Sequence, residues 1–297
     1  MRYLLTALFL SAACAGGEPE PAADPAAMPS PEAPAFDVTM EPEDSVIFEQ
    51  KIAWARENRL DTLEVGAAMA ALGRTFVGAP YTPATLELEG NERLIVNLRE
   101  LDCVTFIENV MAITRVLRAG TPDFRSFQRE LVRIRYRDGE LNGYPSRLHY
   151  FSEWIANNEA KGIVEDVTRS IGGVPDTGAV TFMTRNRQAY RQLADDAVEA
   201  EIRRIEGSLA SHERFYIPQD RIDGVAGEIR DGDIIAATST LEGLDIAHTG
   251  LALWVDGRLH LMHAPLVGSV VEISELPLAT RLQRITAQDG IMVARPR

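Results

Sequence analysis

The sequence of 297 residues has few cysteines, fewer basic than acidic residues, and no long hydrophobic run. Its two cysteines, Cys14 and Cys103, are too few for a disulfide framework in the body of the protein. It has 30 basic and 44 acidic residues and no basic cluster, which excludes a nucleic-acid partner because binding phosphates requires a basic surface. The apolar run Leu4–Ala13 is too short to span a membrane. HExxH or similar ligand spacings are also lacking, so we expect neither a metal nor another cofactor.

The N-terminus has the pattern of a signal peptide, which we expect to cover residues 1–14. A basic residue precedes the apolar run, and small residues precede Cys14. The string LSAAC resembles the lipobox of bacterial lipoproteins, although Leu10 lies four places before Cys14 and Ser11 occupies a usually aliphatic position. We therefore expect an exported lipoprotein, lipidated at Cys14 and facing the periplasm. The alternative is plain export to the periplasm or the medium.

Residues 15–44 consist mostly of Pro, Ala, Gly and acidic residues, without a hydrophobic period. Such a segment has little apolar surface to bury, so we expect a disordered tether. The folded domain is then expected to span residues 45–297. It retains one cysteine, Cys103, and a lone cysteine is ordinarily a buried apolar side chain.

Helical patterns come first in this domain and strand patterns afterwards, which predicts an α+β fold. Helical spacing occurs over residues 45–76, as one or two helices, over Cys103–Arg118, and near residues 124–134, 147–157 and 186–210. Strands are expected at Leu94–Leu98, Ile234–Thr238, Ala247–Val255, Arg258–Ala264 and Ser269–Ile273.

The position of Cys103 favours a reactive thiol over a buried apolar side chain. Asp102 precedes an apolar helical stripe, so it is expected to cap the helix and to make Cys103 the first helical residue. The free N–H groups and the positive dipole end there favour a thiolate, which would lower the pKa of Cys103. The negative charge of Asp102 acts in the opposite direction, so the net shift is not predicted.

A thiol nucleophile needs a base, and the chain offers five histidines. If Asp256–Gly257 forms the two-residue turn of a hairpin, residues whose numbers sum to 513 lie opposite one another. His248 then lies diagonal to His263 on the same face, about 7–8 Å away at the backbone. His260 falls on the other face and is expected to be structural. The remaining two are His149 and His212.

The face that carries His248 also carries Gly250 and Ala252, whose small side chains would let a helix approach. We expect the helix that begins at Cys103 to pack there. The result would be a Cys–His–His arrangement, in which the second histidine orients the first.

These residues resemble a known superfamily. The strings HTGLALWVDGRLHLMHA and DGDIIAATS are similar to the catalytic sheet of the papain-like NlpC superfamily of bacterial cell-wall cysteine hydrolases. More narrowly, NLRELDCVTFIENVMA, IRYRDGELNGYPSRLHYFSEWI and GLDIAHTG resemble the N-acetylmuramoyl-L-alanine amidase-like family, over roughly residues 65 to 295. The resemblance implies a papain-like fold with the nucleophile helix packed on an antiparallel sheet.

The resemblance also implies roles for individual residues. Cys103 matches the nucleophile, His248 the base and His263 the orienting residue. Pro265 stands where the family usually has Ser, which removes a hydroxyl near the site. The implied reaction is hydrolysis, through a thioester acyl-enzyme, of the amide between N-acetylmuramic acid and L-alanine in peptidoglycan fragments.

The segment YPSRLHY, residues 144 to 150, is the predicted substrate-binding segment. Arg147 is expected to grip a carboxylate, and the other polar residues to donate further hydrogen bonds. Tyr81 is a further candidate for the cleft, or a core residue, and Glu108 is expected to pair with a neighbour. In the alternative interpretation, Arg147 forms a surface ion pair and the rest of the segment packs a helix. The residues expected to donate these further hydrogen bonds to substrate are Ser146, His149 and Tyr150.

Two alternatives to the amidase remain open at this point. Other branches of the superfamily cut the stem peptide after D-glutamate, so an endopeptidase is one of them. The other is a non-catalytic lipoprotein that binds muropeptides.

Overall fold

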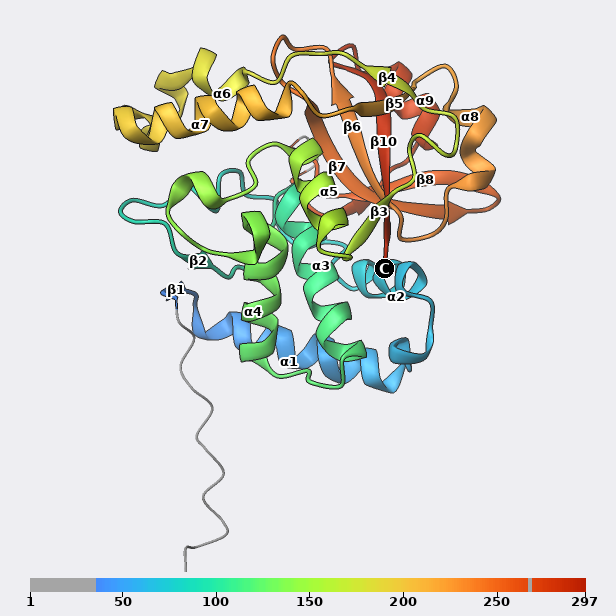
Figure 1. Cartoon of the computed structure of the whole chain (residues 1–297). Coiled ribbons are helices and arrows are strands. Elements are labelled where there is room, and N and C mark those ends of the chain that lie inside the picture. The colour runs from blue at the N-terminus through green and yellow to red at the C-terminus, as the bar shows by residue number, and fades with distance from the viewer. Residues whose placement is uncertain (1–35, 267–268) are drawn as a thin grey trace, which may run out of the picture. The chain divides into compact units, whose positions relative to one another are not determined.

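Helices form the first half of the fold and strands most of the second half (Figure 1). The computed structural model describes residues 36–266 and 269–297. The longer helices are α1 Pro42–Glu57, α2 Val65–Arg74, α3 Cys103–Arg118, α4 Phe124–Arg135, α5 Phe151–Ala160 and α7 Asp196–Leu209. The shorter ones are α6 Phe182–Arg185, α8 Ile222–Val225 and α9 Leu278–Gln283. None of the helices in these two ranges is long and apolar enough to cross a membrane.

The strands form an antiparallel sheet whose order is β4-β5-β10-β6-β7-β8-β9, with β3 paired to β10. A separate parallel pair joins β1 Val38–Thr39 to β2 Leu94–Ile95. The mixed α and β prediction, with an antiparallel sheet, is therefore confirmed. The strands of the large sheet are β3 Val164–Asp166, β4 Val174–Asp176, β5 Arg214–Pro218, β6 Ile234–Ser239, β7 Ile246–Val255, β8 Arg258–His263, β9 Glu272–Ile273 and β10 Gln288–Pro296.

The fold begins before the predicted boundary at residue 45. Strand β1 and the first turn of α1 belong to it, and the Asp44 side chain is fully buried. Its carboxylate accepts hydrogen bonds from the backbone N–H groups of Glu41 and Leu98. The expected tether, residues 15–44, is therefore wrong at its C-terminal end. The expected signal peptide and Cys14 lie outside the described residues.

The two faces of the sheet belong to different hydrophobic clusters. Leu251 and Met262 pack in the same cluster as Phe106 of α3, whereas Ala252 and Leu261 pack in a second cluster with α9. The expectation that α3 covers the Gly250 and Ala252 face is therefore wrong. Helices α2 and α3 pack on the other face, where larger side chains fill the space.

A segment of residues 177–213 separates the paired strands β4 and β5. It contains α6 and α7, which extend beyond the sheet in Figure 1. Its apolar residues form a third cluster together with Tyr144 and Tyr150. We call this segment the cap, because it packs over the loop that was predicted to bind substrate.

Candidate active site

Asp102 caps helix α3 and makes Cys103 its first residue, as predicted. One carboxylate oxygen accepts hydrogen bonds from the N–H groups of Val104, at 3.0 Å, and Thr105, at 2.7 Å. The hydroxyl of Thr105 accepts in return from the N–H of Asp102, at 2.9 Å. This reciprocal capping box fixes the first turn of the helix.

The thiol of Cys103 is unpaired and only partly exposed. Burial, followed by the negative charge of Asp102, raises its pKa to about 11. Hydrogen bonds from Thr249 lower the pKa by less than these two effects raise it. The expected lowering by the helix dipole is therefore outweighed, and the resting form at neutral pH is the thiol.

The β7–β8 hairpin has the predicted register. Leu251 lies opposite Met262, and the turn residues Asp256 and Gly257 both have positive φ angles, of 48° and 74°. Two consecutive positive φ angles are typical of the two-residue hairpin turn that Asp-Gly favours.

This register brings two histidines together. Nε2 of His248 lies 2.7 Å from Nδ1 of His263, and the ring planes are almost perpendicular, at 84°. His260 faces the other way, and its Nδ1 lies 2.8 Å from the carbonyl oxygen of Ser274. The structural role expected for His260 agrees with that contact.

Both histidines of the pair are neutral at pH 7. Burial, followed by the charge of Arg281, lowers the pKa of His248 to about 3. Burial, followed by electrostatic interaction with the His248 ring and with Arg281, lowers the pKa of His263 to about 2. A neutral imidazole has one donor and one acceptor nitrogen, so the short contact joins a donor on one ring to an acceptor on the other.

Thr249 joins the nucleophile helix to the strand that carries His248. Its hydroxyl donates a hydrogen bond of 2.8 Å to the carbonyl oxygen of Cys103. Within the described part of the chain, Cys103 and His248 themselves make no hydrogen bond. The sequence analysis missed Thr249, although a polar residue directly after the predicted base was a signal that could have found it.

A cavity of about 210 Å³ lies at the start of α3, and its lining includes the two sequence neighbours of Cys103 but neither Cys103 nor the histidine pair. Asp102 and Val104 of the α3 start line it, together with Arg147, His149 and Tyr150 of the predicted binding segment. The cap closes part of the same cavity through Phe182, Met183 and Tyr190.

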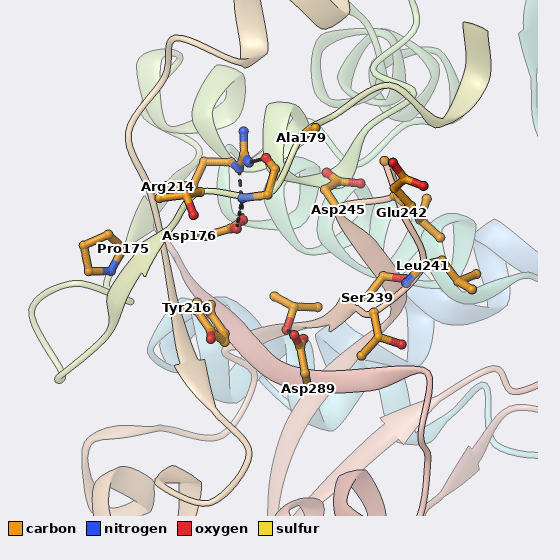
Figure 2. Close-up of a pocket in the computed structure, with 16 residues that line it drawn as sticks. Pro175, Asp176, Ala179, Arg214, Tyr216, Ser239, Leu241, Glu242, Asp245 and Asp289 are labelled. Carbon is orange, nitrogen blue, oxygen red and sulfur yellow. Dashed lines mark hydrogen bonds and ion pairs between the residues drawn. The ribbon is translucent and has the colours of Figure 1, made fainter. Parts of the chain in front are cut away.

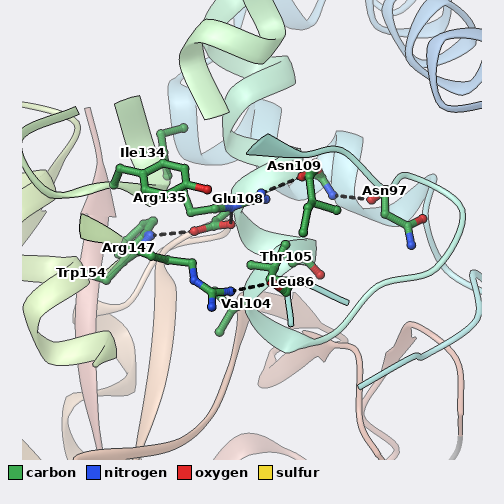
Figure 3. Close-up of polar contacts among 12 residues, drawn as sticks. Leu86, Asn97, Val104, Thr105, Glu108, Asn109, Ile134, Arg135, Arg147 and Trp154 are labelled. Carbon is green, nitrogen blue, oxygen red and sulfur yellow. Dashed lines mark hydrogen bonds and ion pairs between the residues drawn. The ribbon is translucent and has the colours of Figure 1, made fainter. Parts of the chain in front are cut away.

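Arg147 is buried and already paired with two carboxylates. Its guanidinium lies 2.5 Å from Glu87 and 3.4 Å from Glu92. It also donates to the carbonyl of Leu86 at 3.3 Å, the contact that Figure 3 shows. Burial lowers the pKa of Arg147, but the two carboxylates outweigh this and raise it above its usual value. The alternative of a surface ion pair is wrong, because only 5% of the residue is exposed. The predicted binding of a substrate carboxylate by Arg147 stays a prediction.

The other polar residues of the predicted binding segment are also bound within the protein. The hydroxyl of Ser146 makes both of its hydrogen bonds inside its own loop, and Ser146 does not line the cavity. His149 contacts the carbonyl of Tyr144 at 2.9 Å, and burial lowers its pKa well below the usual value. Tyr150 donates to Glu206 of the cap at 2.7 Å. The expected free donors are therefore in use.

Tyr81 lies near the nucleophile, whereas Glu108 is part of the nucleophile helix α3. Tyr81 is partly exposed, and its pKa is raised by burial and then by the nearby Cys103 and Asp102. Glu108 is buried, and its carboxylate accepts from Arg135 at 2.7 Å and from the indole of Trp154 at 3.2 Å (Figure 3). Tyr81 therefore lies close to the nucleophile, and Glu108 pairs with a neighbour as expected.

A second pocket, of about 460 Å³, lies at the ends of strands β4, β5 and β6 (Figure 2). Four carboxylates line it, and each is already engaged; the first, Glu242, pairs with Arg185. Asp176 pairs with Arg214 at 3.2 Å, and Asp289 accepts from Thr238 at 2.6 Å. Asp245 accepts from a backbone N–H of α5. This acidic pocket therefore offers no paired free carboxylates for catalysis.

Comparisons with known proteins match most of the chain. The model of a family described as AmiA-like, N-acetylmuramoyl-L-alanine amidase-like, matches residues 71–291. A crystal structure named as an N-acetylmuramoyl-L-alanine amidase from Bacteroides uniformis is 37% identical, with a TM-score of 0.75. The alignment covers 78% of this chain and 99% of that one.

Two further structures are similar over most of their length. A protein from Bacteroides fragilis, provisionally named a xylanase, is 37% identical over 75% of this chain and 98% of that one, with a TM-score of 0.71. A Legionella pneumophila protein is 19% identical over 85% of this chain and 96% of that one, with a TM-score of 0.60, so it is similar in fold. A comparison with curated proteins finds no match.

Proposed function

Because the chain belongs to the N-acetylmuramoyl-L-alanine amidase-like family, we propose that it hydrolyses the amide between N-acetylmuramic acid and L-alanine, with Cys103 as nucleophile. His248 is the base and His263 orients it. The observation that carries this proposal is the short contact between the two histidines. His248 lies on strand β7, and the next residue of that strand, Thr249, contacts Cys103. The same arrangement supports membership of the papain-like NlpC superfamily.

The hydrogen-bond pattern of the histidine pair supports the direction of proton transfer. Nε2 of His263 is buried, makes no hydrogen bond within the described residues, and lies 3.7 Å from the carboxylate of Glu272. That carboxylate favours a proton on Nε2, which leaves Nδ1 of His263 to accept from Nε2–H of His248. Nδ1 of His248 then has a free lone pair, as a general base requires.

The reaction proceeds from a neutral thiol and a neutral imidazole. As the sulfur of Cys103 attacks the amide carbonyl, His248 takes the thiol proton and then gives it to the departing amine. The C–N bond breaks and a thioester remains. Water, deprotonated by His248, releases the acid and restores the thiol. The backbone N–H of Cys103 and the nearby hydroxyl of Tyr81 are the donors proposed to stabilise the oxyanion.

The cavity supports released muropeptides as substrates in preference to intact wall. Residues of the cap close one side of it, and we infer that this limits the length of a chain that can enter at the start of α3. Arg147 contributes to the shape of this cavity, and its charge is balanced by Glu87 and Glu92. Recognition of a substrate carboxylate by Arg147 would require displacement of one of them.

Export is part of the proposal, because peptidoglycan lies outside the cytoplasm. A lipid on Cys14 would hold the enzyme at the membrane facing the periplasm. A Cys14→Ser variant should lose membrane association in detergent phase separation. Aqueous recovery of both proteins would instead favour plain export.

The test of the proposed function is product analysis by mass spectrometry on a panel of defined muropeptides. The wild-type protein should release the intact stem peptide, beginning with L-alanine, and Cys103→Ser should fold and be inactive. Cleavage after D-glutamate would identify an endopeptidase instead. Binding without turnover by the wild-type protein would identify a non-catalytic receptor. An active Cys103→Ser protein would exclude the cysteine mechanism.

A further inference from the structure

Thr249 is a buried polar residue at the junction of the nucleophile helix and the catalytic strand. Only 2% of its surface is exposed, and it lies opposite Ala236 of β6 on the sheet face that packs against α3. Its hydroxyl donates to the carbonyl oxygen of Cys103 at 2.8 Å. Because neighbouring residues on a strand point to opposite faces, Thr249 meets the nucleophile residue while His248 points to His263.

The hydroxyl of Thr249 has one hydrogen and two possible acceptors. In the resting protein the hydrogen is used by the carbonyl of Cys103, whose second lone pair is available to the helix. A thiolate is a stronger acceptor than a neutral carbonyl, and a threonine hydroxyl rotates freely about its C–O bond. Formation of the thiolate therefore gives this hydrogen a better partner close by.

We propose that Thr249 is a positioning residue whose hydroxyl holds the first turn of α3 against β7 and turns to the sulfur when Cys103 loses its proton. This inference rests on the proposed role of Cys103 as nucleophile. It is supported by the hydrogen bonds from the Thr249 hydroxyl and backbone N–H, which lower the pKa of the thiol against the effect of burial.

The other groups around the thiol differ from Thr249 in their effect. The carboxylate of Asp102 is negative and raises the thiol pKa, and Tyr81 is a neutral phenol whose own pKa is raised. The imidazole of His248, on the neighbouring strand position, is neutral because burial lowers its pKa to about 3. Thr249 is thus the side chain that favours the thiolate without needing a charge.

The experiment compares Thr249→Ser, which keeps the hydroxyl, with Thr249→Val and Thr249→Ala, which remove it. Thr114→Val is the matched control. Thr114 lies on the nucleophile helix α3 and is 1% exposed. Its hydroxyl donates to the carbonyl of Val110 at 2.8 Å, away from the site. For each full-length variant, the rate of iodoacetamide labelling is followed from pH 6 upwards by mass spectrometry of the peptide that contains Cys103. The melting temperature and kcat are measured in parallel.

The Val and Ala variants should show a thiol pKa about one unit higher, and roughly 10-fold slower labelling and turnover at pH 7. The Ser variant and Thr114→Val should label at the wild-type rate. A Val or Ala variant that labels like wild type over the whole pH range would overturn the inference, and so would a folded Ser variant that labels as slowly as Ala. If Val does not fold, the comparison of Ser with Ala decides. Failure of the proposed function is recognised separately, by an active Cys103→Ser protein.

Discussion

The β7–β8 hairpin and the segment of residues 144 to 150 are both rich in polar residues, but they use them differently. In the hairpin, His248 contacts His263, and its remaining ring nitrogen makes no hydrogen bond within the described part of the chain. In the loop, Arg147 and Tyr150 are bound to carboxylates from distant parts of the sequence. The hairpin thus keeps a free reactive atom, whereas the loop uses its polar groups to hold its own shape.

This difference separates catalytic capacity from structural support. A buried polar group without a hydrogen-bond partner costs stability, and both regions contain such atoms: Nε2 of His263 in the hairpin, and the hydroxyl of Tyr144 and Nε of Arg147 in the loop. The atom that sets the hairpin apart is Nδ1 of His248, which the proposed mechanism uses as the base. The loop of residues 144 to 150 instead forms a wall of the cavity, and its paired charges keep that wall in place.

The largest effect on activity is expected at the hairpin. Replacement of His248 by Ala removes the proposed base and should reduce kcat by about 10²- to 10⁴-fold, while folding persists because the ring is only partly buried. The measurement is release of the stem peptide from a defined muropeptide, with circular dichroism as the check on folding. His260→Ala is the matched control and should retain near-normal kcat. Equal losses for the two variants would contradict the assignment of the catalytic face.

The largest effect on stability is expected at the loop. Arg147→Met leaves Glu92 buried without its cation, and breaking a buried ion pair costs about 3–5 kcal/mol of unfolding free energy. Glu87→Gln is the control. The side chain of Glu87 is 34% exposed, so its loss should cost less than about 1 kcal/mol. Urea denaturation measures both. A stable Arg147→Met protein with a raised KM alone would favour the interpretation of Arg147 as a substrate-binding residue.

The parts of the fold that the sequence predicts best are those determined by neighbours along the chain. Asp102 caps α3 through residues two and three positions away, and the Asp256–Gly257 turn determines which residues of the hairpin face one another. Both features depend on backbone geometry over short distances, so they could be derived before the structure was known.

The parts that could not be predicted depend on contacts between distant residues. Strand β10 lies between β5 and β6 and is buried on both faces, so it shows no alternation of apolar and polar residues. Arg147 seemed free because its partners, Glu87 and Glu92, lie more than 50 residues earlier. The face on which α3 packs is decided by the fit of large side chains, which the small size of Gly250 and Ala252 did not indicate.

A smaller effect, on the pH dependence of stability, is expected from His263, as from His248, because burial lowers both pKa values. His263 has a pKa of about 2 in the folded protein and an ordinary value near 6.5 when unfolded, so the unfolded chain binds more protons between these values. Stability should therefore fall as pH drops below about 6.5, and His263→Asn should reduce the loss between pH 7 and 5 by about 1–2 kcal/mol. Denaturation curves at both pH values test this, with His212→Asn at an exposed position as control. An unchanged pH dependence would mean that His263 is charged in the folded state.

The smallest effect is expected at Ser146, which the sequence placed in the substrate site. Its hydroxyl accepts from the N–H of Asn142 at 2.9 Å and donates to the carbonyl of Gly143 at 2.7 Å, both inside one turn. Because this turn is open to solvent, water can replace the lost hydroxyl, and Ser146→Ala should cost less than about 1 kcal/mol. Ser146 lies outside the lining of the cavity at the start of α3, so KM and kcat for a muropeptide should stay within about two-fold of wild type. A rise in KM of about 10-fold at unchanged stability would show that substrate reaches this turn, and the distinction between a reactive hairpin and a supporting loop would then fail.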